Sequence, residues 1–219
     1  MAMEHREPPR VERCFVRLAD GILAGGYQPG QRLDEVQLGE RLAVSRNTLR
    51  EAFRMLAHEQ LVEHHPNRGV FVRRIGPEES RHLFAVRRHL ELGALDDLAA
   101  RAVQCQLAPD SAALERLVHT VVLAARARDR DDWVGVGTAN ALFHMALVEL
   151  ADNPVASRLM RIVTAQTRLR YLTLGNPRAV HESFLDENQR IADLLRAGQL
   201  ARARGVLELY LLRAEEELS

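Results

Sequence analysis

The pattern of apolar residues changes once along this 219-residue chain, at Pro77. Before that point, helical periodicity is interrupted by turn signals and two short strand-like runs. After it, apolar residues recur at helical spacing and no further strand signal follows. The change predicts a mainly α protein with two domains, a small mixed domain over residues 1–75 and an all-α domain over residues 76–219, joined between Arg74 and Pro77.

The first region has the element order of a winged helix-turn-helix. A flexible lead over residues 1–10 is followed by helix, helix, tight turn, helix and hairpin. Ala43-Val44-Ser45 forms the tight turn, with Ser45 placed to cap the next helix, and Pro66-Asn67-Arg68-Gly69 has the chemistry of a hairpin loop. The predicted helices are residues 11–24, 35–42 and 46–58, and the predicted strands are residues 61–64 and 70–73.

The distribution of charge says more than its total. The chain has 30 acidic and 30 basic residues, all of the latter arginine, so its net charge of zero gives no sign of a nucleic-acid partner. Residues 41–74, however, hold seven arginines and three acidic residues, a local net charge of +4. A basic patch of this kind is typical of a surface that binds phosphates.

The second helix of a helix-turn-helix pair enters the major groove of DNA. Its first turn is here rich in short polar side chains and arginine, and arginine can bind a guanine edge or a phosphate. At the wing tip, Arg68 and Gly69 are suited to reach a narrow minor groove. The predicted DNA-binding residues are therefore Ser45, Arg46, Asn47, Thr48, Arg50, Arg68 and Gly69.

The second region is predicted to be an antiparallel helical bundle, because the loops between its helical segments are short. Several polar residues fall on the apolar stripes of these helices and should point inward. An unpaired buried polar group costs about 1–3 kcal/mol, so a convergent set indicates a polar cavity for a small-molecule effector, although each residue could also be a hydrogen-bonded core residue. The six helices are expected at residues 77–104, 109–129, 131–151, 153–174, 177–197 and 199–218, and the candidate effector-binding residues are Arg87, Asn140, His144, Gln166, Asn188 and Tyr210.

Three segments carry a resemblance to a known family. Residues 22–30 (ILAGGYQPG), residues 38–52 (LGERLAVSRNTLREA) and residues 66–69 (PNRG) resemble the GntR family of bacterial transcription regulators. The helical remainder resembles its FadR-type subfamily, whose effector-binding domain is called FCD, so the resemblance covers nearly the whole chain after residue 10. It implies that Arg46 and Arg50 contact bases or phosphates and that Arg68 with Gly69 makes the wing contact.

Two departures from the family pattern lie in the first region. Asn47-Thr48 stands where many members have Thr-Pro, and Gln60 stands where a glycine is usual before Leu61. The first departure is expected to alter operator preference, and the second to leave local strain in a turn.

The resemblance also implies a metal position in the bundle. The FCD domain typically holds a divalent metal with an Asp-x-x-x-His pair and two further histidines on the last two helices. Those positions are occupied here by Asn140, His144, Asn188 and Tyr210. One imidazole with neutral partners should not hold zinc, so no metal and no other cofactor is expected. His89, His119 and His181 have no spacing that would restore the site.

The chain is thus predicted to be a ligand-responsive transcription regulator that binds a palindromic double-stranded DNA operator as a homodimer, with repression more common than activation in such proteins. Arg87 lies in an Arg-x-x-Leu-Glu segment similar to that of the family and suits a carboxylate, so an organic acid or acyl compound is the expected effector. No apolar run approaches the ~20 residues that span a bilayer, and no signal peptide is visible, so a cytoplasmic protein without a membrane partner is expected.

Two alternatives remain. An all-α metal-dependent enzyme is disfavoured, because no HExxH, glycine-rich phosphate loop or Ser/His/Asp motif is present and the inward-facing set lacks a carboxylate base. A regulator-like protein that has lost ligand control, and acts as a constitutive DNA-binding or interaction protein, would be favoured if the inward polar groups bond one another without a cavity.

Overall fold

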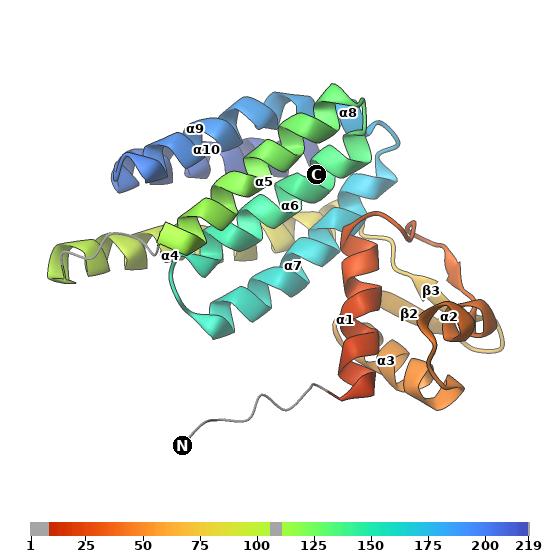
Figure 1. Cartoon of the computed structure of the whole chain (residues 1–219). Coiled ribbons are helices and arrows are strands. Elements are labelled where there is room, and N and C mark those ends of the chain that lie inside the picture. The colour runs from red at the N-terminus through yellow and green to blue at the C-terminus, as the bar shows by residue number, and fades with distance from the viewer. Residues whose placement is uncertain (1–8, 106–110, 219) are drawn as a thin grey trace, which may run out of the picture.

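The computed structural model describes residues 9–105 and 111–218. Most of the predicted flexible lead lies outside these residues, and Arg10 already begins the first helix. The chain forms a small N-terminal region with a three-stranded sheet and a larger helical region, which confirms the predicted mainly α class (Figure 1). Among the helices of the described residues, none is long and apolar enough to span a bilayer.

The N-terminal region has the predicted winged order with one added strand. A two-residue strand pairs with the wing, with Arg32 opposite Phe71 and Leu33 opposite Val70, and it is too short to show any alternation in the sequence. The sheet is antiparallel in the order β1-β3-β2. Its elements are α1 (Arg10–Leu23), β1 (Arg32–Leu33), α2 (Glu35–Leu42), α3 (Arg46–His58), β2 (Val62–His65) and β3 (Gly69–Val72).

Local chemistry sets the helix-turn-helix. The Asp34 side chain accepts hydrogen bonds from two backbone N–H groups at the start of α2. Ala43 takes a left-handed conformation, with φ of 54°, and ends that helix. Ser45 Oγ then accepts from the Thr48 backbone N at 3.2 Å and begins α3. These caps explain why both helices begin, and α2 ends, where the sequence predicts.

The larger region contains seven α-helices among the described residues, and the predicted fifth helix is broken into three pieces. No glycine or proline lies within residues 178–197, so the periodicity gave no sign of the break. The break sits between His181 and Phe184, both of which are buried. The elements are α4 (Pro77–Cys105), α5 (Ser111–Asp129), α6 (Trp133–Glu149), α7 (Pro154–Thr173), α8 (Pro177–His181), the 3-10 helix η1 (Glu182–Phe184), α9 (Leu185–Arg196) and α10 (Leu200–Leu218).

Helix α6 is the central element of the bundle. It is apolar on all sides rather than along one stripe, as expected of a helix surrounded by others, and it lies between α5 and α7 (Figure 1). Asn140 and His144 are both on this helix and both are buried. The polar groups at the centre of the bundle are therefore held by its least exposed helix.

Helix α7 joins the two regions. It packs on α1, and one cluster of buried apolar residues runs from Leu18 and Ile22 of α1 to Ala165 and Leu169 of α7. Asp20 of α1 also pairs with Arg161 of α7 at 3.2 Å. The N-terminal region is thus packed against the bundle as well as linked to it by the segment 73–76.

Candidate functional site

The first turn of α3 presents its polar residues to solvent. Arg46, Asn47 and Arg50 are exposed, whereas Leu49 and Phe53 on the opposite side are buried. Within the described part of the chain, neither Arg46 nor Arg50 has an acidic partner. Both guanidinium groups are therefore available to an anionic partner in solution.

Ser45 and Thr48 differ from the neighbouring arginines because their side chains make local hydrogen bonds. Their hydroxyl groups lie 2.9 Å apart, and Ser45 also caps the backbone of the helix. Arg54, one turn beyond Arg50, pairs with Glu51. The free cationic surface of α3 is thus confined to its first turn and a half.

The wing places Arg68 beside the sheet. Its guanidinium lies 5.8 Å from the centre of the Phe71 ring, and its side chain is exposed. Gly69 has a φ of 103°, and a Cβ there would lie 3.3 Å from Arg32 Nε. Gly69 therefore shapes the wing through its backbone, whereas Arg68 supplies the charge.

A buried charged network occupies one side of the bundle interior. Glu91 of α4 accepts from Arg87 Nε at 2.8 Å through one carboxylate oxygen and lies 2.6 Å from His144 Nδ1 through the other. All three side chains are at most 2 % exposed. The expectation that the inward set lacks a carboxylate is therefore wrong. The signal was present, since Arg87 and Glu91 are four residues apart and share a helix face.

This network fixes the charge of its members. Burial favours the neutral form of Glu91, but Arg87 and His144 outweigh burial and hold the pKa of the carboxyl below its ordinary value. Burial lowers the pKa of His144 despite the opposing charge of Glu91, and Arg87 acts in the same direction as burial. A neutral His144 must carry its proton on Nδ1 to donate to Glu91, and its Nε2 then holds a lone pair without a partner in the described structure.

A second buried polar cluster in the bundle interior is centred on Asn140. Its Oδ1 accepts from Asn188 Nδ2 at 2.6 Å and from the Tyr210 hydroxyl at 2.9 Å. Burial raises the pKa of Tyr210 well above its ordinary value, so this residue stays a hydrogen-bond donor. The periodicity placed these three residues inward, and all three are buried.

The residues at the FCD metal positions do not fit a divalent ion. Asn140 Oδ1 already accepts two internal hydrogen bonds, and Tyr210 keeps its proton. His144 alone offers an imidazole nitrogen. In the described residues, no three His, Cys, Asp or Glu side chains come together as a metal-binding group.

A third group contains Arg168 and His181, which the sequence did not single out as ligand-binding residues. Arg168 is 2 % exposed and donates to the carbonyls of Val134 at 2.8 Å and Leu23 at 3.3 Å, and its Nη1 lies 3.1 Å from His181 Nε2. Burial lowers the pKa of Arg168 to about 10. Burial, together with Arg168, lowers the pKa of His181 to about 3.

Gln166 is the one candidate effector residue that lies elsewhere. Its Nε2 donates to the carbonyl of Glu59, in the N-terminal region, at 2.8 Å. Helix α7 packs on α1 as well as on the bundle, so its buried surface is broader than one stripe and includes Thr164, Thr167 and Arg168. The stripe assumed from the sequence therefore selected Gln166 in place of Arg168.

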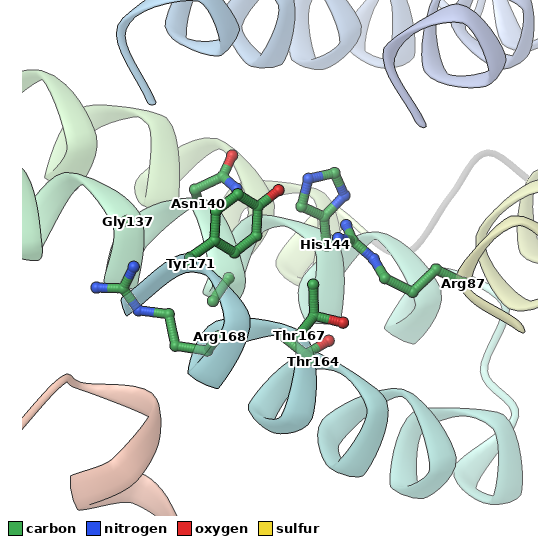
Figure 2. A pocket seen from close by; sticks show the side chains of 9 residues that line it. Arg87, Gly137, Asn140, His144, Thr164, Thr167, Arg168 and Tyr171 are labelled. Atoms are coloured by element: carbon green, nitrogen blue, oxygen red, sulfur yellow. The ribbon is translucent and has the colours of Figure 1, made fainter. Parts of the chain in front are cut away.

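A small cavity lies between α4, α6 and α7, and Figure 2 shows the side chains around it. In this view the Tyr171 ring lies between Arg168 and the pair of Arg87 and His144. The free space is about 10 Å³, which is room for about one water molecule. Two polar atoms of the lining, His144 Nε2 and Thr164 Oγ1, have no hydrogen-bond partner in the described structure, whereas the Arg87 guanidinium and the Tyr171 hydroxyl interact with each other.

Comparison with known proteins finds two family models that match this chain. Residues 11–72 match the family model of the bacterial regulatory proteins of the gntR family, and residues 82–213 match the FCD domain. LutR, an HTH-type transcriptional regulator of Bacillus subtilis, is 26 % identical over 219 residues, covering 90 % of this chain and 96 % of LutR. The galactonate operon transcriptional repressor of Escherichia coli is 26 % identical over 208 residues, covering 85 % of this chain and 87 % of the repressor.

Solved structures of GntR-type regulators resemble this chain over nearly its whole length. The crystal structure of a protein described as a GntR transcriptional regulator from Rhodococcus sp. RHA1 has a TM-score of 0.83 and 36 % identity, covering 95 % of this chain and 97 % of that one. McbR/YncC of E. coli has a TM-score of 0.81 at 20 % identity, covering 97 % of this chain and 98 % of that one, and shares the fold. The chain therefore belongs to the GntR family of bacterial DNA-binding transcription regulators and carries an FCD domain.

Proposed function

We propose that this regulator binds a palindromic double-stranded DNA operator as a homodimer, with α3 in the major groove and the wing at the adjacent minor groove. The observation that carries the proposal is the difference between the two faces of α3. One face is buried through Leu49 and Phe53, and the other presents Arg46 and Arg50 without acidic partners in the described residues. Two copies related by a two-fold axis would present two such helices to two half-sites.

The predicted DNA-binding residues divide into two roles. Arg46, Asn47, Arg50 and Arg68 are exposed and would contact bases or phosphates. Ser45, Thr48 and Gly69 would act mainly by fixing the backbone that presents those side chains, because their contacts are local.

The bundle would hold a small-molecule effector, with an organic acid or acyl compound as the expected class. The unpaired His144 Nε2 and Thr164 Oγ1 at the cavity support this, because a buried polar group without a partner costs about 1–3 kcal/mol. Ligand binding would shift the population of arrangements of the two DNA-binding regions. The domain boundary would lie in the segment 73–76, between β3 and α4.

A regulator without ligand control is the second candidate. The hydrogen bonds within the Asn140 group and the cavity of only about 10 Å³ favour it. If an effector larger than a water molecule does bind, the bundle interior has to open to admit it. Saturation of the chain by a ligand that changes operator affinity would decide against this candidate.

We propose repression as the mode of action, because relatives of this chain include the galactonate operon repressor and the repressor RspR of E. coli. Such a protein would work in the bacterial cytoplasm, where the chromosome is. These two points depend on relatives and not on the geometry of the site.

The DNA-binding proposal can be tested with Arg46→Ala and Arg50→Ala. The operator is first selected from a random DNA pool with the wild-type protein, and affinity is then measured by fluorescence anisotropy. Each variant should lose specific binding by about 10–100-fold, the effect of one good base contact. Arg54→Ala, on the same helix but paired with Glu51, is the matched control and should bind nearly as well as wild type. Wild-type affinity in both variants would reject α3 as the recognition helix.

A further inference from the structure

Arg168 is a buried cation held by neutral groups. Its described partners are two backbone carbonyls and the imidazole of His181, which burial keeps neutral. Arg87, by comparison, is neutralised by Glu91 at 2.8 Å. A buried charge without a counter-charge is expensive in free energy, so Arg168 is the side chain in this interior that gains most from an anion.

We propose that Arg168 is the anion-binding group of the effector site, and that a bound carboxylate draws its guanidinium away from the carbonyl of Leu23. The proposal rests on the ligand control proposed above and names its charge requirement and its route to the DNA-binding region. It also replaces Arg87 as the residue expected to recognise the carboxylate.

The wall of the cavity is built around this guanidinium. Gly137 of α6 leaves room for it, because a Cβ at that position would lie 2.2 Å from Arg168 Nη1 and 2.4 Å from His181 Nε2. Arg168 lines the cavity together with Tyr171 and with Thr164, whose hydroxyl group has no partner in the described structure. A carboxylate beside Arg168 would thus meet hydroxyl donors as well as a cation.

The same guanidinium reaches the DNA-binding region. Its Nε donates to the carbonyl of Leu23, the last residue of α1, over 3.3 Å. Helix α1 packs on the proposed recognition helix α3, and Figure 1 shows α7 passing the C-terminal end of α1 at an angle. A carboxylate brings a full negative charge to its hydrogen bonds with the guanidinium, which the neutral carbonyl of Leu23 does not. It would therefore compete well for Arg168 and loosen the contact between α7 and the end of α1.

Anion competition also accounts for the small cavity. The guanidinium fills the space between Gly137, His181 and the end of α1 in the present arrangement. Movement of this group toward a ligand would open space and break the Leu23 contact in one step. Charge recognition and signal to the DNA-binding region would then be the same event.

The test uses the full chain and sodium salts of acetate, succinate, citrate and phosphate, against sodium chloride of equal ionic strength. The neutral amides acetamide and succinamide serve as uncharged probes. Binding is measured by calorimetry, and operator affinity is measured with and without each anion. At least one anion should bind the wild-type protein and change operator affinity, and the amides should do neither.

Arg168→Gln should weaken that anion at least tenfold, the effect of losing a hydrogen bond to a charged group. It should also shift ligand-free operator affinity in the direction that the anion shifts the wild type, since it removes the Leu23 contact. Gln166→Ala is the matched control: it removes another contact from α7 to the N-terminal region and should keep anion binding. If circular dichroism shows that Arg168→Gln does not fold, Arg168→Lys keeps the charge but not the planar fork and should still weaken the anion about tenfold.

Three results would overturn the proposal: no anion binds the wild type, the amides bind as well as the acids, or the folded Arg168 variants bind the anion like wild type. The proposed regulator function is tested separately. If an amide changes operator affinity, ligand control stands and the anion site fails. If the wild type binds its operator and no probe affects it, DNA binding stands and the Arg168 route fails.

Discussion

The same side chain has opposite surroundings in the two regions of this molecule. On α3, Arg46 and Arg50 are in solvent with no acidic partner among the described residues. In the bundle, Arg87 and Arg168 are each about 2 % exposed. The charge of an exposed arginine is stabilised by hydration and can contact any phosphate, whereas a buried arginine requires partners fixed in place. The first arrangement suits an extended anion such as DNA, and the second suits selection of one small molecule.

The largest effect should come from removing the counter-charge of Arg87. Glu91→Gln leaves a buried guanidinium uncompensated and should lower the free energy of unfolding by about 3–5 kcal/mol. Chemical denaturation measures this change. Glu182→Gln is the control, because Glu182 pairs with Arg178 at the surface at 2.9 Å and its loss should leave stability unchanged. Equal effects of the two substitutions would remove the distinction between interior and surface charge.

The next effect is a loss of stability in acid. His181 has a pKa of about 3 in the folded protein and an ordinary value of 6.5 when unfolded. Between those values the unfolded chain binds the extra proton, so stability is highest above pH 6.5 and falls as the pH is lowered toward 3. From pH 6.5 to pH 5 this group should cost about 2 kcal/mol, at 1.4 kcal/mol per pH unit.

The acid effect is checked by denaturation at a series of pH values. Burial also lowers the pKa of His144, so the wild type loses stability through both histidines. His181→Gln keeps an acceptor for Arg168 but cannot titrate, and its stability should fall less steeply. A variant with the same pH dependence as wild type would show that His181 is not held neutral by its surroundings.

A smaller effect is expected from a single hydroxyl. Tyr210→Phe removes the donor to Asn140 Oδ1, which still accepts from Asn188, so the cost should be about 1 kcal/mol. Thr164→Val removes a buried hydroxyl that has no hydrogen-bond partner in the described structure and should cost no stability. Thermal denaturation of the two variants compares a paired with an unpaired hydroxyl directly, and a larger loss for Thr164→Val would contradict this assignment.

The smallest stability effect should be at the proposed DNA-binding surface. Arg50→Ala should change the free energy of unfolding by less than about 0.5 kcal/mol, because the side chain is exposed and unpaired. The same variant should bind the operator poorly, as proposed above. A large loss of stability would show that the exposed arginines of α3 and the buried arginines of the bundle contribute alike to stability.

Sequence reasoning was strongest where short-range chemistry decides the structure. The caps at Asp34 and Ser45 act within three residues, and both helices of the pair begin where they were predicted. Five of the six candidate effector residues are buried, as predicted. The prediction succeeded because the helical periodicity of apolar residues indicates which helix face is buried. Their roles in DNA and ligand binding stay predictions.

The sequence-based predictions failed where contacts between distant elements determine the local structure or burial. Helix α7 contacts two regions, so its phase could not be set from one stripe, and Arg168 was missed in favour of Gln166. The break around η1 has no glycine or proline to mark it. The two-residue strand β1 exists only through pairing with β3. None of these features is encoded by neighbours in the sequence alone.

The packing of α7 has a consequence for protein engineering. This helix contributes to the bundle interior and also meets the N-terminal region through Asp20, Leu23 and Glu59. A chimera that joins this bundle to another winged domain at residues 73–76 would replace all three partners while keeping α7 intact. Under the ligand control proposed above, such a hybrid would still bind its effector but would not pass the signal to the new domain, unless the matching surface of α1 were transplanted with the bundle.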